Sequence, residues 1–287
     1  MVQNSYIWYN GEFHRSESAV LNSSNRAFRY GDGLFETIHC FGTEPYYLNL
    51  HYERLTRGLQ LLEIEQPYTL SNAKLQEVIT KLLNKNRHFG STRVRVSVFR
   101  SGGGLFTPDE NAASVVVESQ PLDFKFYHYN SQGLMVDIYP DILKPVNVLA
   151  SVKSCNALLY VKAGLFRKRK ILDECIILNE YGRAAESISS NIFIVKKNEI
   201  FTPGLSEGCI HGIMRQVVIE LARDLGFKVY EDVALNTKVF ATCDELFLTN
   251  AISGIRWVLG LGGYRYFNAV SKRLSSELNR VTFKGLV

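Results

Sequence analysis

The 287-residue sequence contains only five cysteines, and no two of them form a Cys-x-x-Cys pair. Their odd number and wide spacing argue against a disulfide framework and against a zinc site; they are Cys40, Cys155, Cys175, Cys209 and Cys243. We therefore expect reduced, packed thiols, as is usual in cytoplasmic proteins. No stretch of the sequence approaches 18 uninterrupted apolar residues, so a membrane-spanning helix is not expected.

The sequence also has no large block of one charge and no evident targeting segment. Lys and Arg number 33 against 28 Asp and Glu, and the net charge is +5. The only dense basic run, Arg167 to Lys170, follows an apolar stretch that we expect to be helical, and a helix C-terminus favours cations. We therefore expect a solvated helix end and no nucleic-acid partner. Met1 to Asn10 shows no basic segment followed by an apolar run, so no signal peptide is expected, and we predict a cytoplasmic protein without a membrane partner.

What the sequence does contain is an ordinary globular composition, with 46% hydrophobic residues. Alternating and helical patterns predict the elements of the first half. Asn10-Gly11 suits the turn of a hairpin, and Ser71 suits a helix N-cap. The expected strands are 6–9, 12–13, 35–41, 46–48, 92–99 and 113–118, and the expected helices are 51–62 and 72–84.

In the second half we expect a hairpin of strands 174–178 and 192–195 with its turn at 179–182. The other expected elements are strands 133–139 and 245–249 and helices 156–168, 213–225 and 271–281. Strands and helices mix without strict alternation, which predicts two α+β domains. Strand signals lapse near Pro121, so we expect domains at 1–122 and 131–287 with a linker at 123–130.

Two segments carry groups suited to chemistry on a heterocycle. Lys153 stands between small residues at a strand-to-helix junction, where partial desolvation favours a neutral amine able to form a Schiff base. An exposed loop lysine is the ordinary alternative. Glu186 stands among small residues just before an apolar run. Its carboxylate could bind a protonated ring nitrogen, or it could cap backbone amides.

Two further segments are suited to anions. The stretch Gly208 to Arg215 leads into a helix, and free amides at a helix start bind phosphate, with Gly212 allowing close approach. An ordinary glycine-containing helix entry is the alternative. Arg54 lies early in a predicted helix and could bind a phosphate oxygen or face water. Gly31-Asp-Gly33 lacks the third glycine of a dinucleotide motif, and we expect Ser101 to Gly104 to be a mobile loop.

Taken together and in order, the motifs resemble those of the fold type IV pyridoxal-phosphate enzymes, the class IV aminotransferase family. That group includes branched-chain and D-amino-acid aminotransferases and aminodeoxychorismate lyases. The resemblance spans nearly the whole chain, and seven motifs carry it: Arg29-Tyr-Gly-Asp-Gly-Leu-Phe-Glu-Thr37, His51-x-x-Arg54-Leu55, Lys153-Ser-x-Asn156, Glu186-x-x-x-x-Asn191-Ile-Phe193, Thr202-Pro203, Gly212-Ile-Met-Arg215 and Asp244-Glu245-Leu-Phe247.

The resemblance implies a two-domain α+β fold like that of D-amino-acid aminotransferase, each domain a mixed sheet or pseudo-barrel with helices. It also implies a pyridoxal 5'-phosphate cofactor and a homodimer. Lys153 would form the Schiff base and transfer protons, and Glu186 would pair with the pyridine nitrogen. The phosphate would be held by the side chain of Arg54 and the amides of Ile213 and Met214.

The sequence departs from the common transaminase pattern at the phosphate site. Met214 replaces a threonine, and Ala251 replaces a second one, for which Asn250 or the Ala251 amide would substitute. These features resemble aminodeoxychorismate lyases, which convert 4-amino-4-deoxychorismate to 4-aminobenzoate and pyruvate, a step of folate biosynthesis. An aminotransferase of branched-chain or D-amino acids is the second hypothesis, and a non-catalytic homologue is the third.

The substrate side is less defined by the resemblance. Phe35 takes the place of a tyrosine that lies near the substrate carboxylate in D-amino-acid aminotransferases, and Thr37 is a second candidate catalytic group. A small-molecule substrate with a carboxylate calls for an arginine. Arg95, Arg100 and Arg256 are the candidates, and the sequence does not rank them. No metal is expected.

Overall fold

The computed structural model describes residues 5–67 and 70–286. The chain divides into two compact units, one formed by Met1–Lys125 with Lys153–Ala157 and the other by Phe126–Val152 with Leu158–Val287. The second unit is thus interrupted where the chain leaves it at Lys153 and re-enters it at Leu158. The expected linker at 123–130 and its flanking domains stay a prediction.

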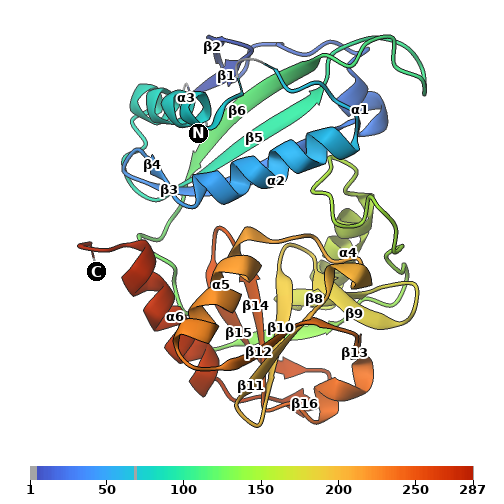
Figure 1. Cartoon of the computed structure of the whole chain (residues 1–287), viewed down its shortest axis with the longest axis vertical. Coiled ribbons are helices and arrows are strands. Elements are labelled where there is room, and N and C mark those ends of the chain that lie inside the picture. Colours follow the sequence, from blue (N-terminus) through green and yellow to red (C-terminus); the bar gives the residue numbers. More distant parts are fainter. Residues whose placement is uncertain (1–4, 68–69, 287) are drawn as a thin grey trace. The chain divides into compact units, whose positions relative to one another are not determined.

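The first unit is built on a six-stranded sheet in the order β2-β1-β6-β5-β3-β4 (Figure 1). Every neighbouring pair in it is antiparallel. The strands are β1 (Tyr6–Tyr9), β2 (Glu12–Arg15), β3 (Gly33–Phe41), β4 (Glu44–Pro45), β5 (Thr92–Arg100) and β6 (Ala113–Pro121). A short helix, α1 (Arg26–Tyr30), leads into β3.

Helices α2 (Leu48–Leu61) and α3 (Asn72–Asn86) pack on this sheet. Strand β5 shows why: Val94, Val96 and Val98 are fully buried, while residues between them are more exposed. Alternate side chains of a strand point to opposite faces, so the valines form the face that the helices can cover. Ser71 caps α3 as predicted, its hydroxyl accepting from the Lys74 amide at 3.2 Å.

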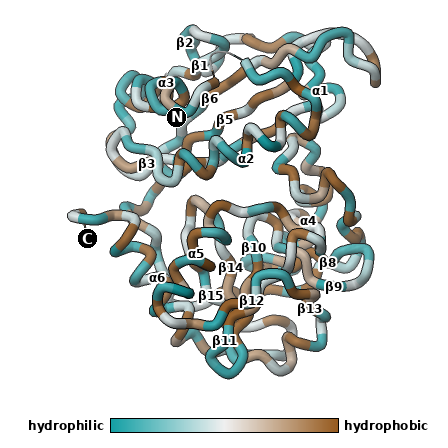
Figure 2. The backbone as a smooth tube through the Cα atoms, viewed as in Figure 1, coloured by the Kyte–Doolittle hydropathy of each residue, from teal (hydrophilic) through white to brown (hydrophobic). Residues whose placement is uncertain are grey.

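The second unit contains a ten-stranded mixed sheet in the order β12-β11-β10-β14-β15-β7-β8-β9-β13, with β16 paired to β15. Hydrophobic residues are concentrated along its central strands (Figure 2). The strands are β7 (Leu134–Ile138), β8 (Glu174–Leu178), β9 (Arg183–Ser187), β10 (Asn191–Lys196), β11 (Glu199–Pro203), β12 (Lys228–Val233), β13 (Leu235–Asn236), β14 (Glu245–Asn250), β15 (Gly254–Leu261) and β16 (Tyr264–Arg265).

This sheet curls back on itself. Strands β9 and β10 are far apart in the strand order, yet only a tight turn joins them, closed by the Ser187 amide donating to the Ser190 carbonyl at 2.8 Å. A sheet whose distant strands are joined so closely must curve, which makes it a pseudo-barrel. The predicted α+β fold is confirmed. The sheet of the second unit is mixed, as expected, whereas the sheet of the first unit is antiparallel throughout.

Three helices accompany the second sheet: α4 (Leu158–Arg169), α5 (Ile213–Asp224) and α6 (Ala269–Thr282). Helix α4 packs on β8, while α5 and α6 pack on each other and on β14. Short 3-10 helices span Leu205–Glu207 and Thr237–Ala241. Within the described ranges, no helix is long and apolar enough to cross a membrane.

Two predicted elements are wrong. Residues 46–48 are not a strand, because Tyr47 takes a left-handed conformation and α2 begins at Leu48. The partner of strand 174–178 is β9, not the strand at 192–195, which pairs with β11 and β14. The error has a physical cause: β9 reads Arg-Ala-Ala-Glu-Ser, and alanine and glutamate are poor strand formers.

Candidate functional site

Lys153 is positioned by backbone pairing to the start of β3. The Phe35 amide donates to the Lys153 carbonyl at 3.0 Å, and the Cys155 amide donates to the Gly33 carbonyl at 2.8 Å. Gly31 allows this approach, since a Cβ there would lie 3.2 Å from the Asn156 backbone nitrogen and its φ of +67° suits glycine. The motif glycine therefore holds the lysine segment against the sheet.

The half-buried Lys153 side chain lies over an aromatic ring that it shares with an arginine. Its Nζ is 4.4 Å from the centroid of the Phe35 ring, and the Arg95 guanidinium carbon is 3.8 Å from the same centroid. Arg95 is the cross-strand partner of Thr37. Partial burial lowers the pKa of Arg95, which still leaves a cation. Phe35 thus contacts Lys153, Arg95 lies on the same ring, and Thr37 stands opposite Arg95 in the sheet.

Arg54 is engaged in a buried ion pair that the sequence did not indicate. Its Nε donates to Glu36 at 2.8 Å, its Nη2 donates to the other oxygen of that carboxylate, and His51 Nδ1 lies 2.6 Å from Glu36 Oε2. Burial raises the pKa of Glu36, but Arg54 and His51 outweigh it and lower the pKa to about 2. Burial lowers the pKa of His51, and the charge of Lys153 acts in the same direction. Arg54 as a phosphate ligand stays a prediction.

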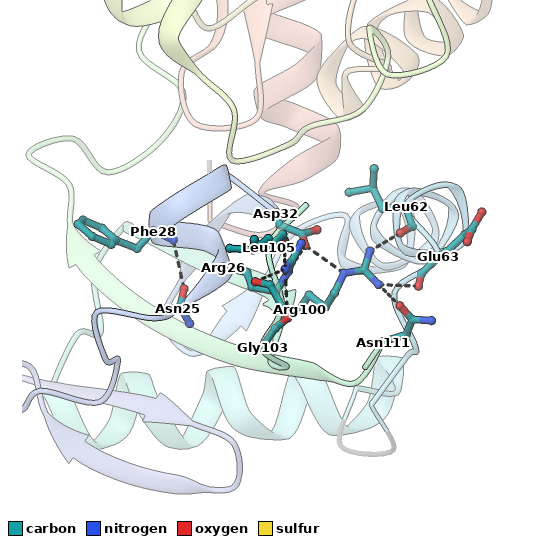
Figure 3. A network of polar contacts seen from close by, with 11 residues as sticks. Asn25, Arg26, Phe28, Asp32, Leu62, Glu63, Arg100, Gly103, Leu105 and Asn111 are labelled. Atoms are coloured by element: carbon teal, nitrogen blue, oxygen red, sulfur yellow. Dashed lines mark hydrogen bonds and ion pairs between the residues drawn. The ribbon is translucent and has the colours of Figure 1, made fainter. Parts of the chain in front are cut away.

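Arg100 is surrounded by acceptors of its own unit (Figure 3). It donates to Asp32 at 3.0 Å, to the Leu62 and Glu63 carbonyls at 2.6 and 3.0 Å, and to Asn111. Arg26 binds the same Asp32 carboxylate and also the carbonyls of residues 103–105. Because four of the five N–H donors of Arg100 are used in this way, its side chain holds loops, and it is a poor choice for a substrate carboxylate.

In the second unit, Glu186 lies on β9 and is 3% exposed. Its Oε1 accepts from Lys144 Nζ and, at 2.6 Å, from the Tyr160 hydroxyl. Its Oε2 accepts from the Ile210 amide at 2.9 Å. A carboxylate offers about four acceptor positions, so these three donors leave room for one more. A ring N–H can take that position.

The start of α5 lies beside this carboxylate, because Ile210 bridges the two. Asn191 Nδ2 donates to the Ile210 carbonyl at 2.9 Å, and the N-cap residue of the helix, Gly212, has no side chain with which to cap it. A Cβ on Gly212 would lie 1.8 Å from Asn191 Oδ1. Thr249 stands opposite Asn191 in the sheet, and within the described chain its buried hydroxyl has no hydrogen-bond partner. Helix-start amides and a hydroxyl without a partner are groups that suit an anion.

The remaining candidate residues, Asn250, Ala251 and Arg256, lie on β14, directly after it and on β15 of the second sheet. Asn250 accepts from the Ile252 and Ser253 amides at 3.0 and 2.8 Å and donates to Ser190 at 2.9 Å, so its side chain holds a turn. The Ala251 carbonyl accepts from the Tyr127 hydroxyl at 3.5 Å. Arg256 is half-buried on β15. No group of acids, histidines or cysteines in residues 5–67 and 70–286 is arranged to hold a metal ion.

A family model described as amino-transferase class IV matches residues 33–260, which includes every predicted site residue. The chain belongs to that family. It is 32% identical over 253 residues to the aminodeoxychorismate lyase of Bacillus subtilis (strain 168), covering 86% of this chain and 83% of that protein.

Among solved structures, the branched-chain amino acid aminotransferase from Escherichia coli is similar, with a TM-score of 0.87, 25% identity, and coverage of 98% of this chain and 95% of that one. The branched-chain amino acid aminotransferase from Thermobaculum terrenum, in its PLP-bound holo-form, has a TM-score of 0.85, 20% identity, and coverage of 99% and 95%. This second likeness concerns the fold.

Five residues that sequence reasoning did not single out belong to these two sites: Glu36, His51, Lys144, Tyr160 and Thr249. Glu36 and His51 stand inside quoted motifs, so the pattern contained them without indicating their contacts. Lys144 lies in a loop 42 residues before Glu186, and no local pattern could have paired them.

Proposed function

We propose that this class IV enzyme is a pyridoxal-phosphate-dependent lyase that converts 4-amino-4-deoxychorismate to 4-aminobenzoate and pyruvate. The observation that carries the proposal is the placement of Lys153 and Arg95 on one aromatic ring, Phe35. That arrangement offers an amine for proton transfer and a cation for a carboxylate across an apolar surface that suits a six-membered ring. The 32% identity of this chain to the aminodeoxychorismate lyase of Bacillus subtilis supports the same proposal.

The second unit contains donors and acceptors that match the two ends of pyridoxal 5'-phosphate. Glu186, with one acceptor position left, would hold the ring nitrogen. The amides of Ile213 and Met214 at the start of α5 would hold the phosphate, because that helix end is uncapped. The Met214 side chain is 1% exposed and apolar, so only its backbone can contribute.

The other proposed cofactor contacts are Arg54 in the first unit and Asn250 and Ala251 in the second. The Asn250 side chain already organises the turn that contains Ala251, which suits it to presenting that turn's backbone to a phosphate oxygen. Arg54, held by Glu36, would offer a pre-oriented cation.

When bound, the cofactor supplies an electron-withdrawing ring that stabilises negative charge on the substrate. Lys153 removes the ring proton of the substrate and is the group that returns a proton as pyruvate leaves. Arg95 binds the substrate carboxylate and fixes the ring relative to Lys153. Phe35 provides the apolar surface, and Thr37, opposite Arg95 in the sheet, is placed as an assisting hydroxyl.

An aminotransferase of branched-chain or D-amino acids is the second candidate, and the structural likeness to the Escherichia coli enzyme favours it. It would use the same lysine and the same cofactor contacts. A non-catalytic homologue is a third candidate, against which the acceptor position left open on the buried Glu186 argues.

One experiment separates these candidates. The protein loaded with pyridoxal phosphate is incubated with 4-amino-4-deoxychorismate, and 4-aminobenzoate and pyruvate are quantified. We expect both products in equal amounts, and their loss in Lys153→Ala. Transfer of amino groups from amino acids to keto acids without either product would establish the aminotransferase instead. Loaded protein inactive in both assays would favour the non-catalytic homologue.

We also propose a cytoplasmic homodimer acting in folate biosynthesis. Exposed aromatic and aliphatic side chains support association, since large apolar surfaces on a soluble protein mark contacts. In the first unit, Phe28, Leu105 and Phe106 are 79%, 72% and 89% exposed.

A further inference from the structure

The second unit contains a buried ion pair between Lys144 and Glu186. The two residues are 5% and 3% exposed, and the Lys144 ammonium donates directly to Glu186 Oε1. Removing charges from water is costly, and a buried acid that kept its charge without a cation would strongly destabilise the fold. The protein therefore supplies its own counter-ion for the carboxylate that we assign to the cofactor nitrogen.

Lys144 is held in place by hydrogen bonds of its backbone and by contacts of its side chain. Its amide donates to the Leu178 carbonyl at 2.8 Å, and its carbonyl accepts from the Glu180 amide at 3.0 Å. Its Nζ lies 5.6 Å from the centroid of the Tyr160 ring, whose hydroxyl donates to the same Glu186 oxygen. The ammonium is thus fixed between an aromatic face and a carboxylate, with little freedom to move away.

The groups that act on Glu186 come from three segments. Lys144 lies after β7, Tyr160 lies on α4, and Cys209 lies before α5. Burial raises the pKa of Cys209 to about 12, and it raises the pKa of Tyr160 further still, so both are neutral at ordinary pH. Of these described groups only Lys144 carries positive charge, and it balances the single charge of Glu186.

From this charge balance, and resting on the proposed cofactor, we propose that Lys144 sets the protonation of the cofactor's ring nitrogen. It does so as a positioning residue that acts through Glu186. A carboxylate already neutralised by an ammonium attracts a second cation less, and the ammonium itself repels a protonated ring. Lys144 therefore lowers the pH at which the ring nitrogen loses its proton.

The test is a titration of the ring nitrogen itself. Pyridoxal phosphate labelled with ¹⁵N in the ring is bound to wild type and to Lys144→Met, and its ¹⁵N resonance is followed against pH over the range in which each protein stays folded. A charge within about 4 to 6 Å shifts a pKa by about 1 to 3 units, and since Lys144 acts through Glu186 the lower end, about 1 pH unit, applies to the ring nitrogen. We expect the midpoint to rise by that amount in Lys144→Met.

Two variants control for charge and for position. Lys144→Arg keeps the charge, and we expect a midpoint near that of wild type. Lys162→Met removes an exposed charge from α4, two residues after Tyr160, and we expect no shift. If Lys144→Met does not fold, Lys144→Gln keeps a hydrogen-bond donor without the charge and should show the same rise.

The outcomes are distinct. A labelled cofactor that binds the Lys144 variants with the wild-type midpoint overturns this inference and leaves the proposed function standing. A wild-type protein that does not bind the labelled cofactor at all overturns the proposed function, and the inference with it.

Discussion

At the scale of single residues, Glu36 gives the clearest dependence on pH. It is 1% exposed, and although burial raises its pKa, the charge of Arg54 and the hydrogen bond with His51 outweigh this and lower the pKa from 4.5 to about 2. A lowered folded-state pKa stabilises the fold above the unfolded value, and this contribution is lost as the pH falls through the folded value. The shift of about 2.5 pH units corresponds to about 3 kcal/mol, lost between about pH 4.5 and pH 2.

We therefore predict that Glu36→Gln is less stable than wild type at neutral pH. Between pH 4.5 and pH 2, however, its free energy of unfolding should fall by about 3 kcal/mol less than that of wild type. Urea denaturation at a series of pH values measures this. Glu53→Gln, an exposed change on α2, the helix that contains His51 and Arg54, should follow wild type. If the free energy of unfolding falls equally with pH in Glu36→Gln and in wild type, this ion pair is not a source of acid sensitivity.

The sequence indicated some of these residues and not others, for a physical reason. Lys153 and Glu186 were recognisable because each stands in a motif with fixed local spacing. The partners Lys144 and Tyr160 act on Glu186 from 42 and 26 positions away in the sequence. Such contacts arise only in the folded chain, where Lys144 bridges to Asn179 and α4 packs on β8 beside β9, so local pattern could not reveal them.

At the scale of elements, the start of α5 is tightly packed at Gly212, which leads to a specific prediction. Gly212 has an ordinary φ of −69°, so a side chain there would be tolerated by the backbone. The obstacle is space, because a Cβ would lie 1.8 Å from Asn191 Oδ1 and would displace it from the loop that leads to the helix. The helix amides would then lose their position around a phosphate.

We predict that Gly212→Ala weakens pyridoxal phosphate binding by at least about tenfold, or about 1.4 kcal/mol. Titration of the apoprotein with the cofactor, followed by absorbance, measures the affinity. Gly164→Ala is the matched control, since nothing lies within 4 Å of the place that its Cβ would take on α4, and its affinity should not change. If folded Gly212→Ala binds the cofactor with unchanged affinity, the phosphate does not bind at the start of this helix.

Elements with strong patterns were predictable from sequence, and weakly patterned ones were not. Strand β5 alternates valine with polar residues, and Ser71 provides a helix cap, so both were predicted. Strand β9 consists mainly of small and polar residues, and its pairing with β8 comes from the tertiary fold. Its misassignment mattered, because it left Glu186 in a loop in the prediction.

At the scale of the whole molecule, we predict a homodimer. The Phe106 ring contacts Tyr30, with the two centroids 5.5 Å apart, yet it remains 89% exposed, so it is available to a second copy. Sedimentation velocity should give twice the 32.6 kDa mass of the chain, and Phe106→Ser should shift the equilibrium toward monomer. A monomeric wild type at micromolar concentration would contradict the proposal.

The central claim is that Lys153 is the residue that binds the cofactor, and the molecule offers a second buried amine, Lys144, as a direct competitor. The cofactor-loaded protein is reduced with borohydride and digested, and the modified peptide is identified by mass spectrometry. We expect a phosphopyridoxyl group on Lys153, absent at that peptide in Lys153→Ala. A group found on Lys144 in wild type, or on no lysine at all, would contradict the claim.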